Sequence, residues 1–77
     1  MRVTVAAHGE LRRHLLAGAP RREVELPEAA TLADLALALG VEAEELALAR
    51  RSDGVLREGT LLREGDLIEL FAPVGGG

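Results

Sequence analysis

The sequence has no cysteine, lysine, tryptophan or tyrosine, and Phe71 is its only aromatic residue apart from two histidines. Without cysteine, the chain cannot form a disulfide or a thiolate metal site, and it has no cysteine nucleophile. All nine basic residues are arginines, and thirteen acidic residues bring the formal net charge to −4. Nucleic-acid-binding proteins usually combine a basic stripe with stacking aromatic side chains. We therefore expect no nucleic-acid partner.

Long apolar segments are lacking too. No apolar run approaches the roughly 20 residues that span a bilayer, and the N-terminal residues lack the charged-then-apolar pattern of a signal peptide. We expect a cytoplasmic protein with no membrane partner. His8 and His14 are the only histidines, and two histidines make a poor metal site, so we expect no metal.

The residues that are present suffice for one small domain. The chain has 77 residues, of which 48% are hydrophobic, so an aliphatic core is expected. A chain this short has little room for a deep substrate pocket beside its core. It also contains no phosphate-binding GxxxxGK[ST] motif. These properties predict a carrier or interaction domain, not a self-sufficient enzyme.

The N-terminal part predicts two strands and a short helix. Residues 2–7 and 22–26 alternate with a period of two, which is typical of strands. Between them, residues 10–17 predict a short helix that Gly18 ends. A parallel crossover needs a dozen or more residues, so we expect the two strands to pair antiparallel.

A second, main helix is marked at both ends. Thr31 is a good N-cap residue, and Asp34 three residues later approximates a capping box. Gly40 is well placed to end the helix. An apolar stripe at helical spacing lies between these signals: Leu32, Leu35, Ala36 and Leu39.

The C-terminal part predicts further strands at residues 46–50 and 67–72. Asp53-Gly54 predicts a tight turn, and two near-repeats within residues 56–66 indicate local turns and not a solenoid. The order of elements predicts an α+β domain. One main helix would cover one face of a mixed sheet of four to five strands.

The last predicted strand places different side chains on its two faces. Alternation puts Ile68 and Leu70 on one face, with Leu67 and Phe71 on the other. If the helix covers the first face, Phe71 points towards solvent beside Leu67, where an exposed aromatic predicts a partner-binding patch. The alternative is a register shifted by one residue, which would bury Phe71 in the core.

The chain closes with Pro73-Val74-Gly75-Gly76-Gly77. Three glycines cannot hold a stable conformation, so residues 75–77 are expected to form a flexible tail after a domain of residues 1–74. A tail without side chains could thread a narrow channel that rejects bulkier residues. The alternative is a frayed end without function.

The sequence resembles the ubiquitin-like β-grasp sulfur carriers, the MoaD and ThiS proteins. Residues 24–28 (VELPE) and 30–35 (ATLADL) are similar to the family's second strand and central helix, and residues 62–71 to its closing turn and strand. Residues 71–74 (FAPV) running into a terminal diglycine are most similar to MoaD, the small subunit of molybdopterin synthase. Gly75 is a departure, because family members commonly have another residue there.

The resemblance implies a chemistry that needs partners. It implies that a ubiquitin-activating-type adenylyltransferase, MoeB/ThiF-like, uses ATP to adenylate the Gly77 carboxylate, which sulfur then converts to a thiocarboxylate. The Gly76-Gly77 pair would be functional and Gly75 a spacer. Phe71, Leu67, Pro73 and Val74 would contact partners, and the chain itself would bind no cofactor.

The resemblance also implies an acceptor for the sulfur. In molybdopterin synthase this is the MoaE-like large subunit, where the sulfur enters the molybdenum cofactor precursor. Thiamin thiazole, thiolated tRNA and cysteine are alternative sulfur products, and a ubiquitin-like protein modifier or a plain interaction domain are alternative functions. The sequence does not separate these pathways, because pathway choice lies in partner surfaces.

Overall fold

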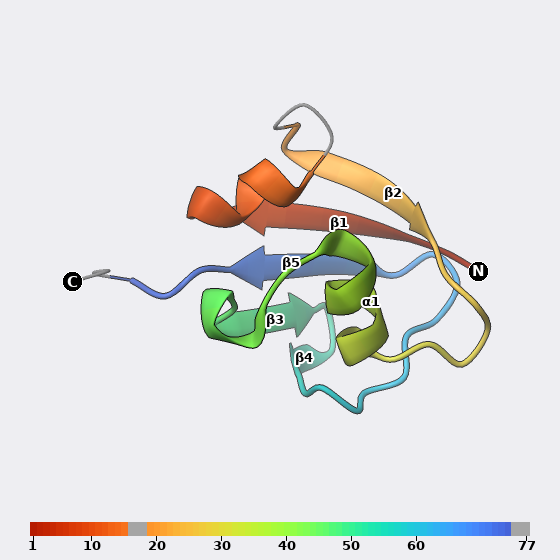
Figure 1. Ribbon diagram of the computed structural model, residues 1–77. Coiled ribbons are helices and arrows are strands. Elements are labelled where there is room, and N and C mark those ends of the chain that lie inside the picture. Colours follow the sequence, from red (N-terminus) through yellow and green to blue (C-terminus); the bar gives the residue numbers. More distant parts are fainter. Residues whose placement is uncertain (16–18, 75–77) are drawn as a thin grey trace.

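A computed structural model describes residues 1–15 and 19–74 of the chain. It contains a five-stranded sheet with the order β2-β1-β5-β3-β4 (Figure 1). The strands are β1 (Arg2–His8), β2 (Arg21–Glu25), β3 (Leu48–Arg51), β4 (Gly54–Leu56) and β5 (Leu67–Phe71). The helices are α1 (Leu32–Leu39) and two 3-10 helices, η1 (Gly9–His14) and η3 (Ala43–Glu45).

The sheet is mixed. β1 pairs antiparallel with β2, as predicted, and parallel with β5, while β3 pairs antiparallel with both β5 and β4. Helix α1 lies across one face of this sheet (Figure 1). The predicted α+β architecture, with one main helix on a mixed sheet, is therefore confirmed.

The core lies between α1 and the face of the sheet that it covers. It is entirely aliphatic, as the composition predicts. Val5 and Ile68 lie side by side in the paired strands β1 and β5, and both are fully buried together with Leu35 of α1. No described residue with a polar or charged side chain is buried.

Helix α1 has the caps that the sequence predicts. The Asp34 N–H donates to Thr31 Oγ1 at 3.3 Å, and the Thr31 N–H donates to Asp34 Oδ2 at 2.9 Å, which completes a capping box. Gly40 has φ of 77°, the left-handed conformation that glycine adopts most readily. Leu32, Leu35 and Leu39 are buried, whereas Leu37 lies off this stripe and is 80% exposed.

Several predicted boundaries differ from the structure. β1 extends one residue further, to His8, and β2 spans Arg21–Glu25 instead of residues 22–26. The first helix is a 3-10 helix that ends at His14, and the part of the prediction at residues 16–18 lies outside the described residues. The strand predicted at 46–50 begins only at Leu48, because the Leu46 N–H bonds back to the Ala43 carbonyl and continues the η3 turn. The last strand ends at Phe71, one residue early.

The near-repeats form local turns, as predicted. The Arg57 N–H donates to Thr60 Oγ1 at 2.9 Å, and the Arg63 N–H donates to Asp66 Oδ2 at 2.8 Å. No helix in the described part of the chain is long and apolar enough to cross a membrane.

Candidate functional site

The C-terminal segment leaves the sheet directly after Phe71. Pro73 and Val74 lead away from the end of β5 (Figure 1), and Val74 is fully exposed. The predicted tail, Gly75 to Gly77, lies outside the described residues. Strand β5 therefore carries the chain from the middle of the sheet to the root of this tail.

The two faces of β5 carry the side chains that alternation predicts. Ile68 and Leu70 are buried against the core, with 0% and 1% exposure. Leu67 is 40% exposed on the face that α1 does not cover, which we call the open face, and Phe71 lies half-buried on the same face. The alternative register, with Phe71 in the core, is wrong. Phe71 is less exposed than expected because two side chains cover its ring.

These two side chains are His8 and Arg50. The His8 imidazole stacks on the Phe71 ring, with centroids 4.5 Å apart and 8° between the planes. The Arg50 guanidinium carbon lies 5.3 Å from the same ring centroid, within the range of a cation–π contact. Phe71 is thus held between residues of β1 and β3, the two neighbours of β5.

Glu69 ties this cluster together. Its Oε1 accepts from Arg50 Nη2 at 2.9 Å and from Arg50 Nε at 3.2 Å. Its Oε2 lies 3.2 Å from His8 Nε2. These contacts, with that to Arg50 the largest, hold the pKa of Glu69 below its ordinary value. The carboxylate therefore stays ionised and orients both side chains that flank Phe71.

Two further apolar residues extend this surface. Leu48 lies opposite Phe71 in the β3–β5 register and is 37% exposed. Val55 lies opposite Arg50 in the β3–β4 register and is 65% exposed. Residues directly opposite in a sheet share a face. We call these residues the open-face patch: Leu48, Val55, Leu67 and Phe71, with Arg50 among them.

Sequence reasoning missed Leu48, Val55 and the role of His8 in this cluster. The signal available in the sequence is the alternation along residues 46–50, which puts Leu48 and Arg50 on the same face of a strand. Which face that is depends on the pairing of β3 with β5, a contact between segments about 20 residues apart. The role of His8 is likewise non-local, because the parallel pairing of β1 with β5 brings it beside Phe71.

The other half of the open face is charged. Arg2 Nε donates to Glu25 Oε1 at 2.9 Å, and Arg2 Nη1 lies 3.8 Å from Glu23 Oε1, across β1 and β2. An apolar half on β5, β3 and β4 thus adjoins a polar half on β1 and β2. The exposed apolar side chains of this face are therefore concentrated on β5, β3 and β4.

A cleft of about 650 Å³ lies at the root of the tail, and Phe71, Pro73 and Val74 are among the residues that line it. Glu45 of η3 also lines this cleft, and it accepts hydrogen bonds from Arg13 and from the Glu42 N–H, the latter at 2.9 Å. His14 Nε2 lies 3.1 Å from the same carboxylate.

This carboxylate joins η1 to η3. The pKa of Glu45 is lowered, chiefly by the hydrogen bond from the Glu42 N–H and then by the hydrogen bond with His14. Among residues 1–15 and 19–74, no three His, Cys, Asp or Glu side chains are grouped so that they could hold a metal ion.

Comparison with known proteins identifies the family. The model of the ThiS family matches residues 9–77, most of the chain. The chain belongs to the ThiS family. A comparison of this ThiS-family protein with curated proteins found no match.

Solved structures with the same fold include molybdopterin converting factor subunits and a small archaeal modifier protein. A putative molybdopterin converting factor subunit 1 from Pyrococcus furiosus has a TM-score of 0.75 and 25% identity, over 96% of this chain and 99% of that one. Small archaeal modifier protein 1 from Haloferax volcanii has a TM-score of 0.78 and 21% identity, over 95% and 98%.

A third similar structure is a complex. Subunits 1 and 2 of the molybdopterin-converting factor from Helicobacter pylori were solved together. The matching chain of this complex has a TM-score of 0.65 and 22% identity to the present chain, over 100% of each of these two chains. Membership of the ThiS/MoaD family makes the present protein a sulfur carrier with a β-grasp fold. Carriers of this family are non-catalytic small subunits and bind no cofactor of their own.

Proposed function

We propose that this ThiS-family protein carries sulfur for molybdopterin synthesis, as the small subunit of a molybdopterin synthase. The observation that carries the proposal is the course of the C-terminal strand. β5 leads from the open-face patch through Phe71, Pro73 and Val74 directly towards Gly75-Gly76-Gly77. The 25% identity to the molybdopterin converting factor subunit from Pyrococcus furiosus, over nearly the whole of both chains, favours this pathway.

The reaction begins with activation of the Gly77 carboxylate. At neutral pH a terminal carboxylate is an anion, because its pKa is about 3.5, and it is a poor electrophile. An adenylyltransferase partner joins a carboxylate oxygen to the α-phosphorus of ATP and releases pyrophosphate. A persulfide sulfur then attacks the acyl carbon and AMP leaves. Reduction of the resulting acyl disulfide by a thiol gives the thiocarboxylate.

The open-face patch would guide both partner encounters. Leu67, Phe71 and Leu48 offer apolar area beside the exit of the tail, and Arg50 offers a cation to an acidic partner residue. Pro73 and Val74 would contact the rim of the partner's channel. Gly76 and Gly77 would enter the channel, where any side chain would obstruct them, with Gly75 as a spacer.

The proposal is tested by intact mass spectrometry. The protein is incubated with an adenylating enzyme of the ubiquitin-activating type from the same genome, ATP and a sulfur donor. We expect a mass shift of one oxygen replaced by sulfur, which is lost when Gly77 is deleted. The product is then added to the molybdopterin synthase large subunit and its pterin precursor, where we expect dithiolene formation. No mass shift with an enzyme that is active on another carrier would contradict the proposal.

The same experiment separates other sulfur acceptors. Thiocarboxylate that forms normally, yet gives no dithiolene with the large subunit, would assign the carrier to thiamin thiazole, tRNA thiolation or cysteine synthesis instead.

A second candidate function is protein modification. The TM-score of 0.78 to small archaeal modifier protein 1 from Haloferax volcanii favours it. In that case the activated Gly77 would form an isopeptide bond with a lysine of another protein. Lysine-linked conjugates in a cell extract, absent after deletion of Gly76 and Gly77, would support this function.

A further inference from the structure

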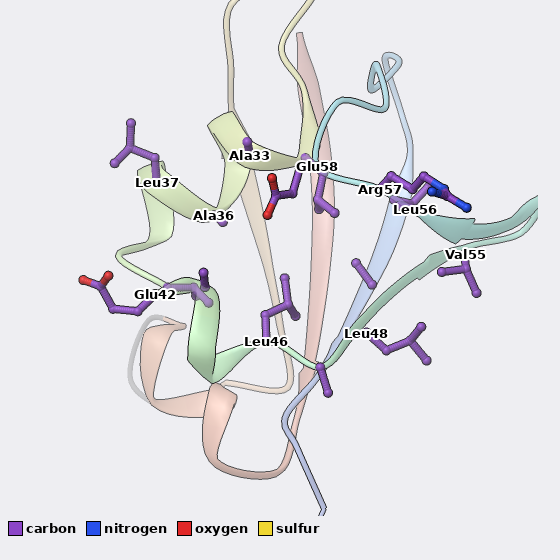
Figure 2. Close-up of a pocket in the computed structure, with 15 residues that line it drawn as sticks. Ala33, Ala36, Leu37, Glu42, Leu46, Leu48, Val55, Leu56, Arg57 and Glu58 are labelled. Atoms are coloured by element: carbon purple, nitrogen blue, oxygen red, sulfur yellow. The ribbon is translucent and has the colours of Figure 1, made fainter.

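A second surface of the molecule lies on the helix side, away from the root of the tail. It is an apolar groove of about 570 Å³ between α1, the η3 turn and strands β3 and β4 (Figure 2). On α1 the lining residues are Leu32, Ala33, Ala36 and Leu37, and Leu46 and Leu56 line the groove from the opposite elements. The wall at Ala33 and Ala36 is open because these side chains are small.

The sheet has an incomplete edge beside this groove. β4 is the last strand of the sheet and pairs only with residues 49–51 of β3. Leu48 is paired with Phe71 of β5 on one side. On its other side, no strand within residues 1–15 and 19–74 pairs with it. Such an edge presents backbone groups that an additional strand can pair with.

The opposite edge of the sheet is protected, in contrast. β2 carries exposed charged residues along its length: Arg21, Arg22, Glu23 and Glu25. Charged side chains on an edge strand discourage pairing with other chains. β4, with Gly54, Val55 and Leu56, has none.

Charges at the groove indicate the chemistry of its occupant. The Glu58 carboxylate points into the space between α1 and β4, and Glu42 lies at the end of the groove near η3 (Figure 2). Arg57 also lines the groove, but its side chain points away from α1 (Figure 2). Neither carboxylate forms an ion pair with any residue in the described ranges 1–15 and 19–74. A basic side chain on the occupant would complement them.

We propose that this groove binds an extended, apolar segment of a partner protein that carries lysine or arginine at its ends. The segment adds a short strand beside Leu48, places alternate aliphatic side chains between Ala36, Leu46 and Leu56, and pairs its basic residues with Glu58 and Glu42. A second copy of this chain is disfavoured as the occupant, because each copy carries a net charge of −4.

The probe is the acetylated and amidated hexapeptide Lys-Leu-Ser-Val-Ser-Lys, titrated into the whole ¹⁵N-labelled protein. We expect amide shifts at residues 33–37, 46–49 and 55–58. The same peptide with glutamate at both ends should bind at least about tenfold more weakly, because it meets the groove carboxylates with like charge. A version with proline in place of both serines should also lose binding, since it cannot donate to the β3 edge.

Variants of α1 provide a matched control. Ala36→Leu fills the groove and should weaken peptide binding by about tenfold or more, and Ala33→Leu is the second variant if the first is unstable. Ala38→Leu is the same change on the same helix at an exposed position that does not line the groove. It should leave the affinity within about twofold. Glu58→Lys should weaken binding, whereas Glu28→Lys should not.

Several results would overturn the proposal. Shifts centred on Leu67 and Phe71 and absent from residues 33–37, or equal affinity for the acidic peptide, would show that the groove does not select a basic apolar strand. Groove shifts that depend on protein concentration without peptide would assign the site to a second copy. Groove shifts that change on removal of residues 75–77 would assign it to the chain's own tail.

Discussion

His8 and Phe71 lie opposite each other in the parallel pair β1 and β5, and their rings stack with centroids 4.5 Å apart. The only phenylalanine of the chain is therefore held in place from the N-terminal strand, while Glu69 fixes both His8 and Arg50 around it. A preorganised aromatic side chain loses less conformational entropy when a partner covers it. This arrangement gives the first prediction.

Replacement of Phe71 should affect partner binding more than stability. Phe71→Ala removes a half-buried ring and a stacked pair worth about 0.5–1.5 kcal/mol beyond its buried area. We expect the variant to stay folded and to bind its activating enzyme at least about tenfold more weakly. Isothermal titration calorimetry measures the affinity. Glu23→Ala, on the charged half of the open face, is the control and should bind normally.

The pH dependence of stability should report the Glu69 network. Its pKa is lowered in the folded protein, chiefly by hydrogen bonds from Arg50 and then by His8. The stabilisation is thus fully present above the ordinary glutamate pKa of about 4.3 and is lost as the pH falls through the lowered pKa.

Glu69→Gln removes this contribution. The difference in unfolding free energy between wild type and variant should be largest near neutral pH and shrink towards pH 3. Circular dichroism in urea is the suitable measurement, since the chain has no tryptophan or tyrosine. A difference that stays constant over this range would mean that the carboxylate charge contributes nothing.

Two leucines of α1 should differ sharply in their effect on stability. Leu35 is fully buried in the core and Leu37 is 80% exposed. Leu35→Ala should cost about 2–5 kcal/mol of unfolding free energy, through lost burial and a cavity. Leu37→Ala should change it by less than about 0.5 kcal/mol. Equal losses at both positions would contradict the packing of α1 described above.

The capping box of α1 should also contribute measurably. Thr31→Ala removes the oxygen that accepts from the Asp34 N–H, and N-cap replacements of this kind cost about 0.5–2 kcal/mol. Thermal unfolding of Thr31→Ser, which keeps the hydroxyl, should remain close to wild type. If serine destabilises the helix as much as alanine, the threonine acts through its methyl group.

The elements that could be predicted from the sequence are those with local causes. Thr31, Asp34 and Gly40 mark helix α1 by their own backbone chemistry, and alternation around Ile68 and Leu70 fixes the faces of β5. The Leu48–Phe71 and Val55–Arg50 neighbours could not be predicted, because strand pairing between distant segments decides them. The 3-10 geometry of η1 was missed as well, since a run of six residues gives the same apolar spacing in either helix type.

The central position of β5 has a mechanical consequence. It lies between β1 and β3, parallel to the first and antiparallel to the second, and Val74 continues from its far end. A pull on Val74 along the strand axis loads the backbone hydrogen bonds on both sides of β5 at once, in shear. These hydrogen bonds would have to break together. In an edge strand that is peeled from the sheet, by contrast, the bonds break one after another. Force on the C-terminal segment would thus be borne by both neighbours of β5 in the middle of the sheet.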